Sequence, residues 1–263
     1  MRYIMMLLLP VAIFAKIHYA KVEPFEIVVI KSAVSALVQR ANLQAEGKMV
    51  VNAEIIHLDD HLDRKDLNSS RESLEILHNM LKINREIVES LDESLKRQKG
   101  YYERLNRLST ASKTQKDTAF NSFVSIKNQY LSTQEKIESL KKQILDMEYK
   151  ISRLEDSISK KSIRLEDRYL YKLAVREGDF VNPGSPLATI QDQNRAKLTL
   201  FLELSELNDL DKKVIYIDGK ETSLKVDKIW RVSDEKFISS YRAEIYMPKP
   251  SGYFSQLLKV ELR

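Results

Sequence analysis

The first residues with the makings of a chemical site lie just ahead of a long polar stretch. His57 and His61 are spaced i to i+4 and stand among three carboxylates, Asp59, Asp60 and Asp63. On a helix this spacing would bring both imidazoles to one face, where they could bind a divalent metal ion. The alternative is an exposed, charged helix start, in which these side chains pair with one another and with solvent. We favour the alternative, and we expect no metal and no cofactor.

Other catalytic signatures are missing from the sequence. The chain of 263 residues has no cysteine, and it contains no nucleophile elbow, no phosphate-binding glycine loop and no serine–histidine pairing. Its formal net charge of +5 is spread over mixed-sign segments, which gives little reason to expect nucleic-acid binding. We therefore expect a protein that is not an enzyme and does not bind nucleic acid.

A long helical segment dominates the middle of the chain. Between Gly47 and Gly178 there is no proline and a single glycine, Gly100. Apolar residues recur there every seven positions, which is the period of a two-helix seam. The first run is Leu67, Leu74, Leu81, Val88, Leu95 and Tyr102, and the second is Phe123, Tyr130, Ile137, Ile144, Ile151, Ile158 and Leu165.

The two runs predict a long antiparallel coiled-coil hairpin over residues 58–167. We expect a first helix from 58 to about 107, capped by Asp59 or Asp60, a polar turn over 109–116, and a return helix to about 165. Each arm would span on the order of 65–70 Å. A second apolar flank on the first helix has two explanations that stay open, a wider seam or contact with a neighbouring subunit. Its residues are Ile76, Met80, Ile83 and Ile87.

The flanks of the hairpin read differently. Residues 1–15 combine a basic start with a short apolar run, which suits a signal peptide cleaved after Ala15, with Ala20 as the second choice. A retained membrane anchor is the alternative. Residues 21–57 and 168–263 read as short β-strands with turn signals. The expected class is therefore α+β.

The β segments carry a resemblance to a known family. Val175 to Ala188, which contains Gly178, Pro183, Gly184 and Pro186, looks like the second half of a lipoyl (biotinyl-like) domain. Ser32 to Val38 and Glu46 to Val50 resemble its first half, with Ala36 where the family usually has glycine. A lipoyl domain split by a helical hairpin and followed by a small β-barrel is similar to the periplasmic adaptor, or membrane fusion protein, family (HlyD-like and RND efflux adaptors).

That resemblance implies a domain organisation. It would place a split lipoyl-like domain at 21–57 and 168–192, the hairpin at 58–167 and a β-barrel at 193–263. It also implies a compact form without the membrane-proximal domain that often follows the barrel. Lipoyl carriers attach their cofactor to a lysine at a turn between strands. In this chain the helical hairpin stands in place of that turn. Lys48 lies in a different loop, so no carrier role is expected.

The resemblance also implies a partner-binding site at the hairpin turn. Relatives that dock on a TolC-like channel carry a motif around this turn. In it, three residues separate an arginine from a leucine, and six residues separate that leucine from a serine. Leu105 and Ser112 fit the second spacing but leave Tyr101 in place of the arginine. Arg104 and Leu108 fit the first spacing but leave too few residues before Ser112. The plain alternative is a seam leucine, a solvated charge and a turn residue. The implied site is Arg104, Leu105, Leu108 and Ser112.

The implied function is that of an adaptor subunit in a tripartite efflux or export system. It would be periplasmic, associated with the inner membrane through its transporter, and would link that transporter to a TolC-like outer-membrane channel. A resistance–nodulation–division (RND) pump is the preferred partner and an ATP-binding-cassette (ABC) transporter the other. The adaptor would be a homo-oligomer, a hexamer or trimer of dimers. The competing interpretation is a periplasmic coiled-coil scaffold or chaperone with no transporter partner.

Overall fold

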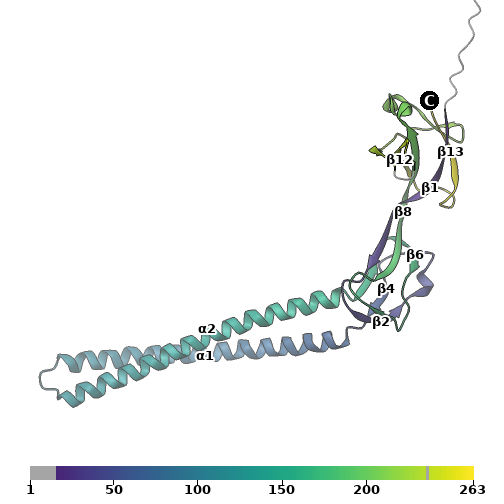
Figure 1. Ribbon diagram of the computed structural model, residues 1–263. Coiled ribbons are helices and arrows are strands. Elements are labelled where there is room, and N and C mark those ends of the chain that lie inside the picture. The colour runs from purple at the N-terminus through teal and green to yellow at the C-terminus, as the bar shows by residue number, and fades with distance from the viewer. Residues whose placement is uncertain (1–15, 235–236) are drawn as a thin grey trace, which may run out of the picture. The chain divides into compact units, whose positions relative to one another are not determined.

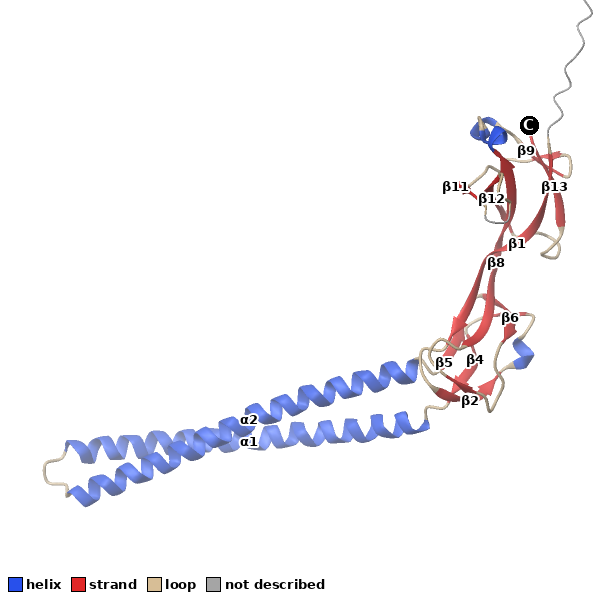
Figure 2. Ribbon diagram, viewed as in Figure 1, coloured by secondary structure: helices blue, strands red, loops and turns tan. Residues whose placement is uncertain are grey.

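The computed structural model describes residues 16–234 and 237–263, so the expected signal peptide at 1–15 lies outside the described residues. The chain divides into two compact units. One is built from strands and comprises the residues up to Ala33, Val38–Ile56 and Ile163–Arg263; the other comprises Val34–Leu37 and His57–Ser162 (Figures 1 and 2). Within the described ranges, no helix has the length and apolar character needed to cross a membrane.

The expected hairpin is present as two helices of equal length. Helix α1 spans His61–Arg107 and helix α2 spans Lys113–Ser159, 47 residues each. At 1.5 Å per residue each is about 70 Å long. They run side by side and are joined by a short turn (Figure 1). The fold is thus a mixture of long helices and sheets, as the sequence indicated.

The seam is built from the heptad residues. Leu81, Ile137, Leu140 and Ile144 are buried together, with Leu74, Leu77 and Val88 packed against them. A polar residue also lies in this seam: Asn84 is 5% exposed, and its amide nitrogen donates to the carbonyl oxygen of Met80 at 2.7 Å. Because that bond is made within α1, the amide is satisfied without a partner on α2.

The return helix ends earlier than its heptad pattern does. We expected α2 to reach about 165, but it stops at Ser159, and Leu165 belongs to strand β5, Ser162–Leu165. Ile163 and Leu165 fit alternation along a strand as well as they fit a heptad. Strand pairing decides between the two, because β5 lies next to β4, Ala53–Leu58, in a four-stranded sheet ordered β5-β4-β2-β7. Its other strands are β2, Ala36–Ala41, and β7, Phe180–Val181.

Two long antiparallel strands form the spine of the larger sheet. They are β1, Ile17–Lys31, and β8, Pro186–Glu203, and their register runs from Val22↔Leu198 to Lys31↔Pro186, with irregularities near Pro24 and Lys31. The main path of the nine-stranded sheet is β10-β9-β13-β1-β8-β12-β11, and β6 pairs with both β3 and β8. The remaining strands are β3 Lys48–Val50, β6 Arg168–Leu173, β9 Ile215–Ile217, β10 Lys220–Glu221, β11 Lys228–Ser233, β12 Ser240–Pro248 and β13 Leu257–Leu262.

Segments from before and after the hairpin are hydrogen-bonded to each other. Strand β3 pairs with β6, with Met49 opposite Tyr169. The amide of Val38 donates to Asp179, and that of Gly178 donates back to Val38. Gly178 has a φ of +90°, a backbone conformation that side chains with a Cβ rarely adopt. The two halves of the sequence therefore complete the same sheets.

A buried cluster of twelve residues lies at the other end of the long strands. It joins Ala20 and Val22 of β1 to residues of β8, β12 and β13, including Leu198, Leu200 and Ile245. The amino-terminal part of β1 thus belongs to a cluster made mostly by residues of 193–263, the range in which the sequence predicts a β-barrel. This contribution follows from the length of β1, which buries Ala20 and Val22 while Tyr19 and Lys21 stay exposed.

Candidate partner-binding site at the hairpin turn

The turn between the helices is fixed by bonds from both sides. The hydroxyl of Ser112 accepts from the amide of Gln115 at 3.2 Å, and the side-chain oxygen of Gln115 accepts from the amide of Ser112 at 2.9 Å. This reciprocal pair is a capping box at the start of α2. On the other side, Lys116 Nζ donates to the carbonyl oxygen of Asn106 at 3.2 Å. The turn therefore presents its remaining side chains from a defined backbone.

The structure brings the four residues of the implied site to the same end of the hairpin but gives them different environments. Arg104 is exposed and Leu108 is 51% exposed, whereas Leu105 is half-buried. Ser112 uses its hydroxyl in the cap. Of the two alignments, Arg104 with Leu108 thus leaves both members accessible to a partner. Leu105 and Ser112 have their own structural roles within the hairpin.

Aromatic residues next to the turn are an addition to the site that the sequence analysis missed. The ring of Tyr102 lies 5.4 Å from that of Phe120 and is stacked on that of Phe123 at 6.2 Å, measured between centroids. Phe120 and Tyr101 remain 45% and 48% exposed. The available signal was the i to i+3 spacing of Phe120 and Phe123, which puts Phe120 beside the seam. The exposed parts of Phe120 and Tyr101 add apolar surface to this end of the hairpin.

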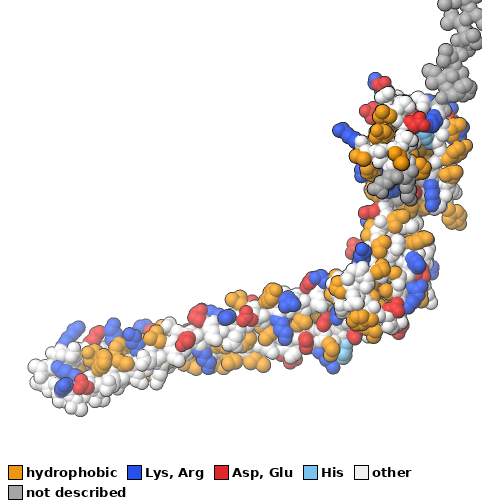
Figure 3. Space-filling model, viewed as in Figure 1, with side chains coloured by type: hydrophobic (Ala, Val, Ile, Leu, Met, Phe, Trp, Pro, Cys, Tyr) orange, Lys and Arg blue, Asp and Glu red, His pale blue; other side chains and the backbone are white. Residues whose placement is uncertain are grey.

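Charge at the turn is predominantly positive. Residues 99–117 carry five basic and two acidic side chains, and Figure 3 shows Lys and Arg gathered beside hydrophobic side chains at this end of the hairpin. Arginine offers several planar donors to carboxylates or backbone carbonyls, while an exposed leucine can fill an apolar groove. The basic members are Lys99, Arg104, Arg107, Lys113 and Lys116.

The histidine and aspartate cluster at the start of α1 forms ion pairs. His57 Nε2 lies 3.4 Å from Asp60 Oδ1, and Arg64 Nη2 lies 2.7 Å from Asp60 Oδ2. Asp63 pairs with Lys161 at 2.8 Å. Burial alone would raise the pKa of Asp60, but the hydrogen bond and charge of Arg64, together with His57, hold that pKa below its usual value. Among the described residues no group of three or more His, Asp or Glu is placed to hold a metal ion.

The same cluster shows how α1 begins. Asp60 occupies the N-cap position but makes no capping bond through its side chain. Instead, Asp59 Oδ1 accepts from the amide of His61 at 3.1 Å. The two aspartates expected as alternatives therefore have separate roles, one binding a backbone amide and the other pairing with Arg64.

Comparisons with known proteins give a fold but no relative in sequence. No protein-family model matches the chain, and no curated protein matches it. Among solved structures, MacA from Actinobacillus actinomycetemcomitans matches with a TM-score of 0.73 at 12% identity, covering 95% of this chain and 79% of that one. A MacA–MexA chimera carrying the Pseudomonas aeruginosa MexA α-hairpin domain matches with a TM-score of 0.56 at 14% identity, over 95% and 81%. The membrane fusion protein Spr0693 from Streptococcus pneumoniae R6 has a TM-score of 0.56 at 10% identity, over 95% and 99%. The chain shares the fold of these proteins.

Proposed function

We propose that this protein, which has the fold of MacA, is a periplasmic adaptor linking an inner-membrane transporter to a TolC-like outer-membrane channel. The observation that carries the proposal is the pairing of segments on both sides of the hairpin. Lys48, Met49 and Val50 precede it, and their ladder partners Leu170, Tyr169 and Arg168 follow it. The match to MacA, which covers 95% of the chain, supports the same proposal.

The domain assignment is part of the same proposal. The paired segments correspond to a split lipoyl-like domain at 21–57 and 168–192, and the cluster around Leu198 and Ile245 to a β-barrel at 193–263. The barrel is completed by the first part of β1, because Ala20 and Val22 belong to its core. The hairpin at 58–167 would act as a strut about 70 Å long.

A mechanical role suits this architecture. The hairpin buries a narrow seam and leaves the rest of both helices exposed and largely polar, so it spans distance without enclosing a reaction site. Export would then depend on sealing and coupling between partners.

An RND pump is the preferred inner-membrane partner, with an ABC transporter as the alternative. The adaptor would act as a homo-oligomer, a hexamer or trimer of dimers.

The hairpin turn is the surface we assign to the channel. Arg104 and Leu108 would make the contacts, one as a multidentate donor and the other as an apolar anchor. Leu105 would hold the seam behind them, and Ser112 the start of α2. The positive charge of residues 99–117 would favour a partner with carboxylates or helix carbonyl ends on its surface.

The test compares three strains in the organism that carries the gene. Deletion of the gene is expected to sensitise cells to at least one toxic compound in a broad panel, and the wild-type gene to restore resistance. The double variant Arg104→Asp, Leu108→Asp is expected to restore none. The matched control, Lys82→Asp with Arg85→Asp, changes two exposed side chains in the middle of α1 and is expected to restore resistance fully.

Two outcomes count against the proposal. If the tip variant is present at normal levels and restores full resistance, the turn is not the channel-binding surface. If deletion changes sensitivity to nothing, and a cross-linker at Leu108→Cys captures no outer-membrane channel, the scaffold or chaperone interpretation replaces the adaptor.

A further inference from the structure

A hollow lies beside an irregularity in the pairing of β1 with β8. Where the register of the two strands shifts, Phe25 of β1 alone stands opposite residues 193–195 of β8. Such a bulge re-aims side chains that regular alternation would point elsewhere. The hollow has a volume of about 440 Å³, and both β8 and β12 contribute to it. Its lining residues are Asn194, Arg195, Tyr246, Met247 and Pro248.

The guanidinium of Arg195 is held by an aromatic ring. Its central carbon lies 3.7 Å from the centroid of the Phe25 ring, and Phe25 meets Tyr246 edge to face at 5.0 Å between centroids. A cation over the face of a ring is attracted by the ring's negative electrostatic potential. Among residues 16–234 and 237–263, no carboxylate forms an ion pair with Arg195, which is exposed. Its planar set of donors is therefore positioned and available.

Two carboxylates that contact Tyr246 are already bound by other groups. Glu244, which is buried and accepts from the Tyr246 hydroxyl at 3.3 Å, pairs with Arg242 at 2.7 Å. Lys197 lies 3.6 Å from the same carboxylate. Asp227 accepts a hydrogen bond from the backbone amide of Tyr246 at 2.7 Å. The negative charges next to the hollow thus have their own partners, and the arginine that lines it does not.

The other walls of the hollow suit an apolar body. Tyr246 and Met247 are partly buried and Pro248 is exposed, and the three together offer aromatic and aliphatic carbon surface. Asn194 adds a side-chain amide that can donate or accept a hydrogen bond. Apolar walls with a few placed polar groups are typical of sites for small molecules. With a single arginine as the charged group, such a site favours a ligand that is anionic at one end and apolar at the other.

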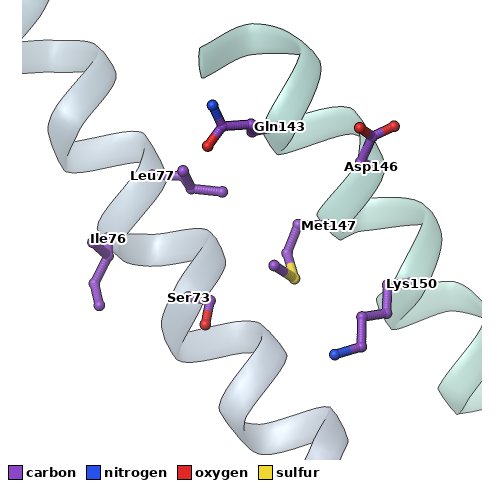
Figure 4. A pocket seen from close by; sticks show the side chains of 7 residues that line it. All are labelled: Ser73, Ile76, Leu77, Gln143, Asp146, Met147 and Lys150. Atoms are coloured by element: carbon purple, nitrogen blue, oxygen red, sulfur yellow. The ribbon is translucent and has the colours of Figure 1, made fainter. Parts of the chain in front are cut away.

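A groove between the two helices of the hairpin differs from this hollow in its charge. It has a volume of about 490 Å³, and Leu77 of α1 and Met147 of α2 extend into it (Figure 4). Asp146 and Lys150 lie at its edge. Because one carboxylate and one ammonium group both line this groove, their opposite charges give an anion little advantage over a neutral molecule. The groove therefore serves as an internal comparison for the hollow at Arg195.

We propose that the hollow at Arg195 binds a small organic anion, a carboxylate or sulfonate with an aromatic or aliphatic body. Arg195 binds the anionic group through its planar donors, and Tyr246 and Met247 cover the apolar body. The stacking of Arg195 on Phe25 orients the guanidinium before the ligand arrives, which reduces the entropy lost on binding. This site goes beyond the proposed adaptor function, because it gives the chain a ligand that needs neither a transporter nor a channel.

Two fluorescent molecules that differ in one group test the site in the purified full-length protein. Anilinonaphthalene sulfonate (ANS) is an aromatic anion, and phenylnaphthylamine has the same rings without the sulfonate. Both gain fluorescence in an apolar environment, so titration gives their affinities. Arg195→Gln is expected to weaken the binding of ANS roughly tenfold, because the sulfonate loses a charge-assisted hydrogen bond. The same variant is expected to bind phenylnaphthylamine as the wild-type protein does.

Two matched controls separate the site from a general effect of charge. Arg231→Gln removes an exposed arginine from β11, and Lys150→Gln removes the ammonium group from the groove of the hairpin. Both variants are expected to bind ANS as the wild-type protein does. If Arg231→Gln weakened ANS binding as much as Arg195→Gln, or if Arg195→Gln bound ANS with unchanged affinity, the inference would be overturned. A wild-type protein that binds no ANS would overturn it as well.

A second variant pair tests the ring that holds the arginine. Phe25→Leu keeps the charge of Arg195 but removes the aromatic face beneath it, and it is expected to weaken ANS binding severalfold. Phe180→Leu is the control, since Phe180 is 65% exposed and lies outside the hollow. Circular dichroism checks that each variant is folded. Equal ANS affinity of the two folded variants would contradict the proposed site. Export plays no part in these measurements, so the ligand site and the adaptor function can fail separately.

Discussion

Met49 and Tyr169 face each other as Cα partners in an antiparallel ladder, although the whole helical hairpin separates them in the sequence. The pairing means that the hairpin leaves and re-enters the same β unit. The distance between the two ends of the hairpin therefore does not depend on how long its helices are.

This pairing predicts a disulfide. Met49→Cys with Tyr169→Cys is expected to form an intramolecular bond on mild oxidation, because directly opposed strand residues have Cβ atoms within disulfide range. The product is detected as a change in gel mobility that a reducing agent reverses. Met49→Cys with Phe180→Cys, whose strands belong to different sheets, is the control expected to stay reduced.

Removing the cap of α2 should destabilise the hairpin. Ser112→Ala is expected to cost about 1 kcal/mol of unfolding free energy, because the amide of Gln115 loses its acceptor. Urea unfolding followed by circular dichroism at 222 nm measures the change. Ser112→Asp, which keeps an acceptor, should retain most of the stability, and Ser90→Ala in the middle of α1 should lose none. Equal stability of Ser112→Ala and wild type would show that the cap contributes nothing.

The seam should respond to truncation according to burial. Leu140 is 3% exposed in the cluster with Leu81 and Ile144. Leu140→Ala is expected to cost about 2–5 kcal/mol, through lost apolar burial and the cavity left behind. Leu131→Ala, at a site 49% exposed, removes the same atoms and should cost under about 1 kcal/mol in the monomer. Similar losses for both variants would contradict the assignment of Leu140 to the buried seam.

The start of α1 should be sensitive to acid. The pKa of Asp60 in the folded protein is below its usual value because Arg64 and His57 outweigh the effect of burial. A depressed folded pKa gives stability that is complete above the unfolded value, about 3.9, and is lost as pH falls through the folded one. Asp60→Asn should therefore be less stable than wild type at pH 7 and should lose less between pH 5 and pH 3. The urea midpoints of both proteins at pH 7, pH 5 and pH 3 measure these differences in stability. If the stability of the two proteins changed with pH by the same amount, Asp60 would not contribute to the loss of stability in acid.

Part of the candidate site at the turn could be predicted from the sequence. The sequence places Ser112 in the turn, and the structure shows it capping α2 through hydrogen bonds with Gln115. The sequence alone could not choose between Leu105 and Leu108 as the exposed leucine, since both fit one half of the spacing. Their exposure depends on where α1 ends, and the helix ends at Arg107, which leaves Leu108 in the turn. Whether a channel binds there stays a prediction.

The order of apolar and polar residues by itself determined the two helices, their length and their seam. A seven-residue apolar period over so long a stretch without proline is compatible with few structures other than a coiled coil. It also determined that β segments flank the hairpin. Tertiary structure decided where patterns were ambiguous: Leu165 fits a heptad and a strand equally, and only pairing beside β4 assigns it to the strand. It likewise decided that Ala20 and Val22 join a core made by residues after 195, because contact between distant segments depends on sheet order, which local periodicity does not encode.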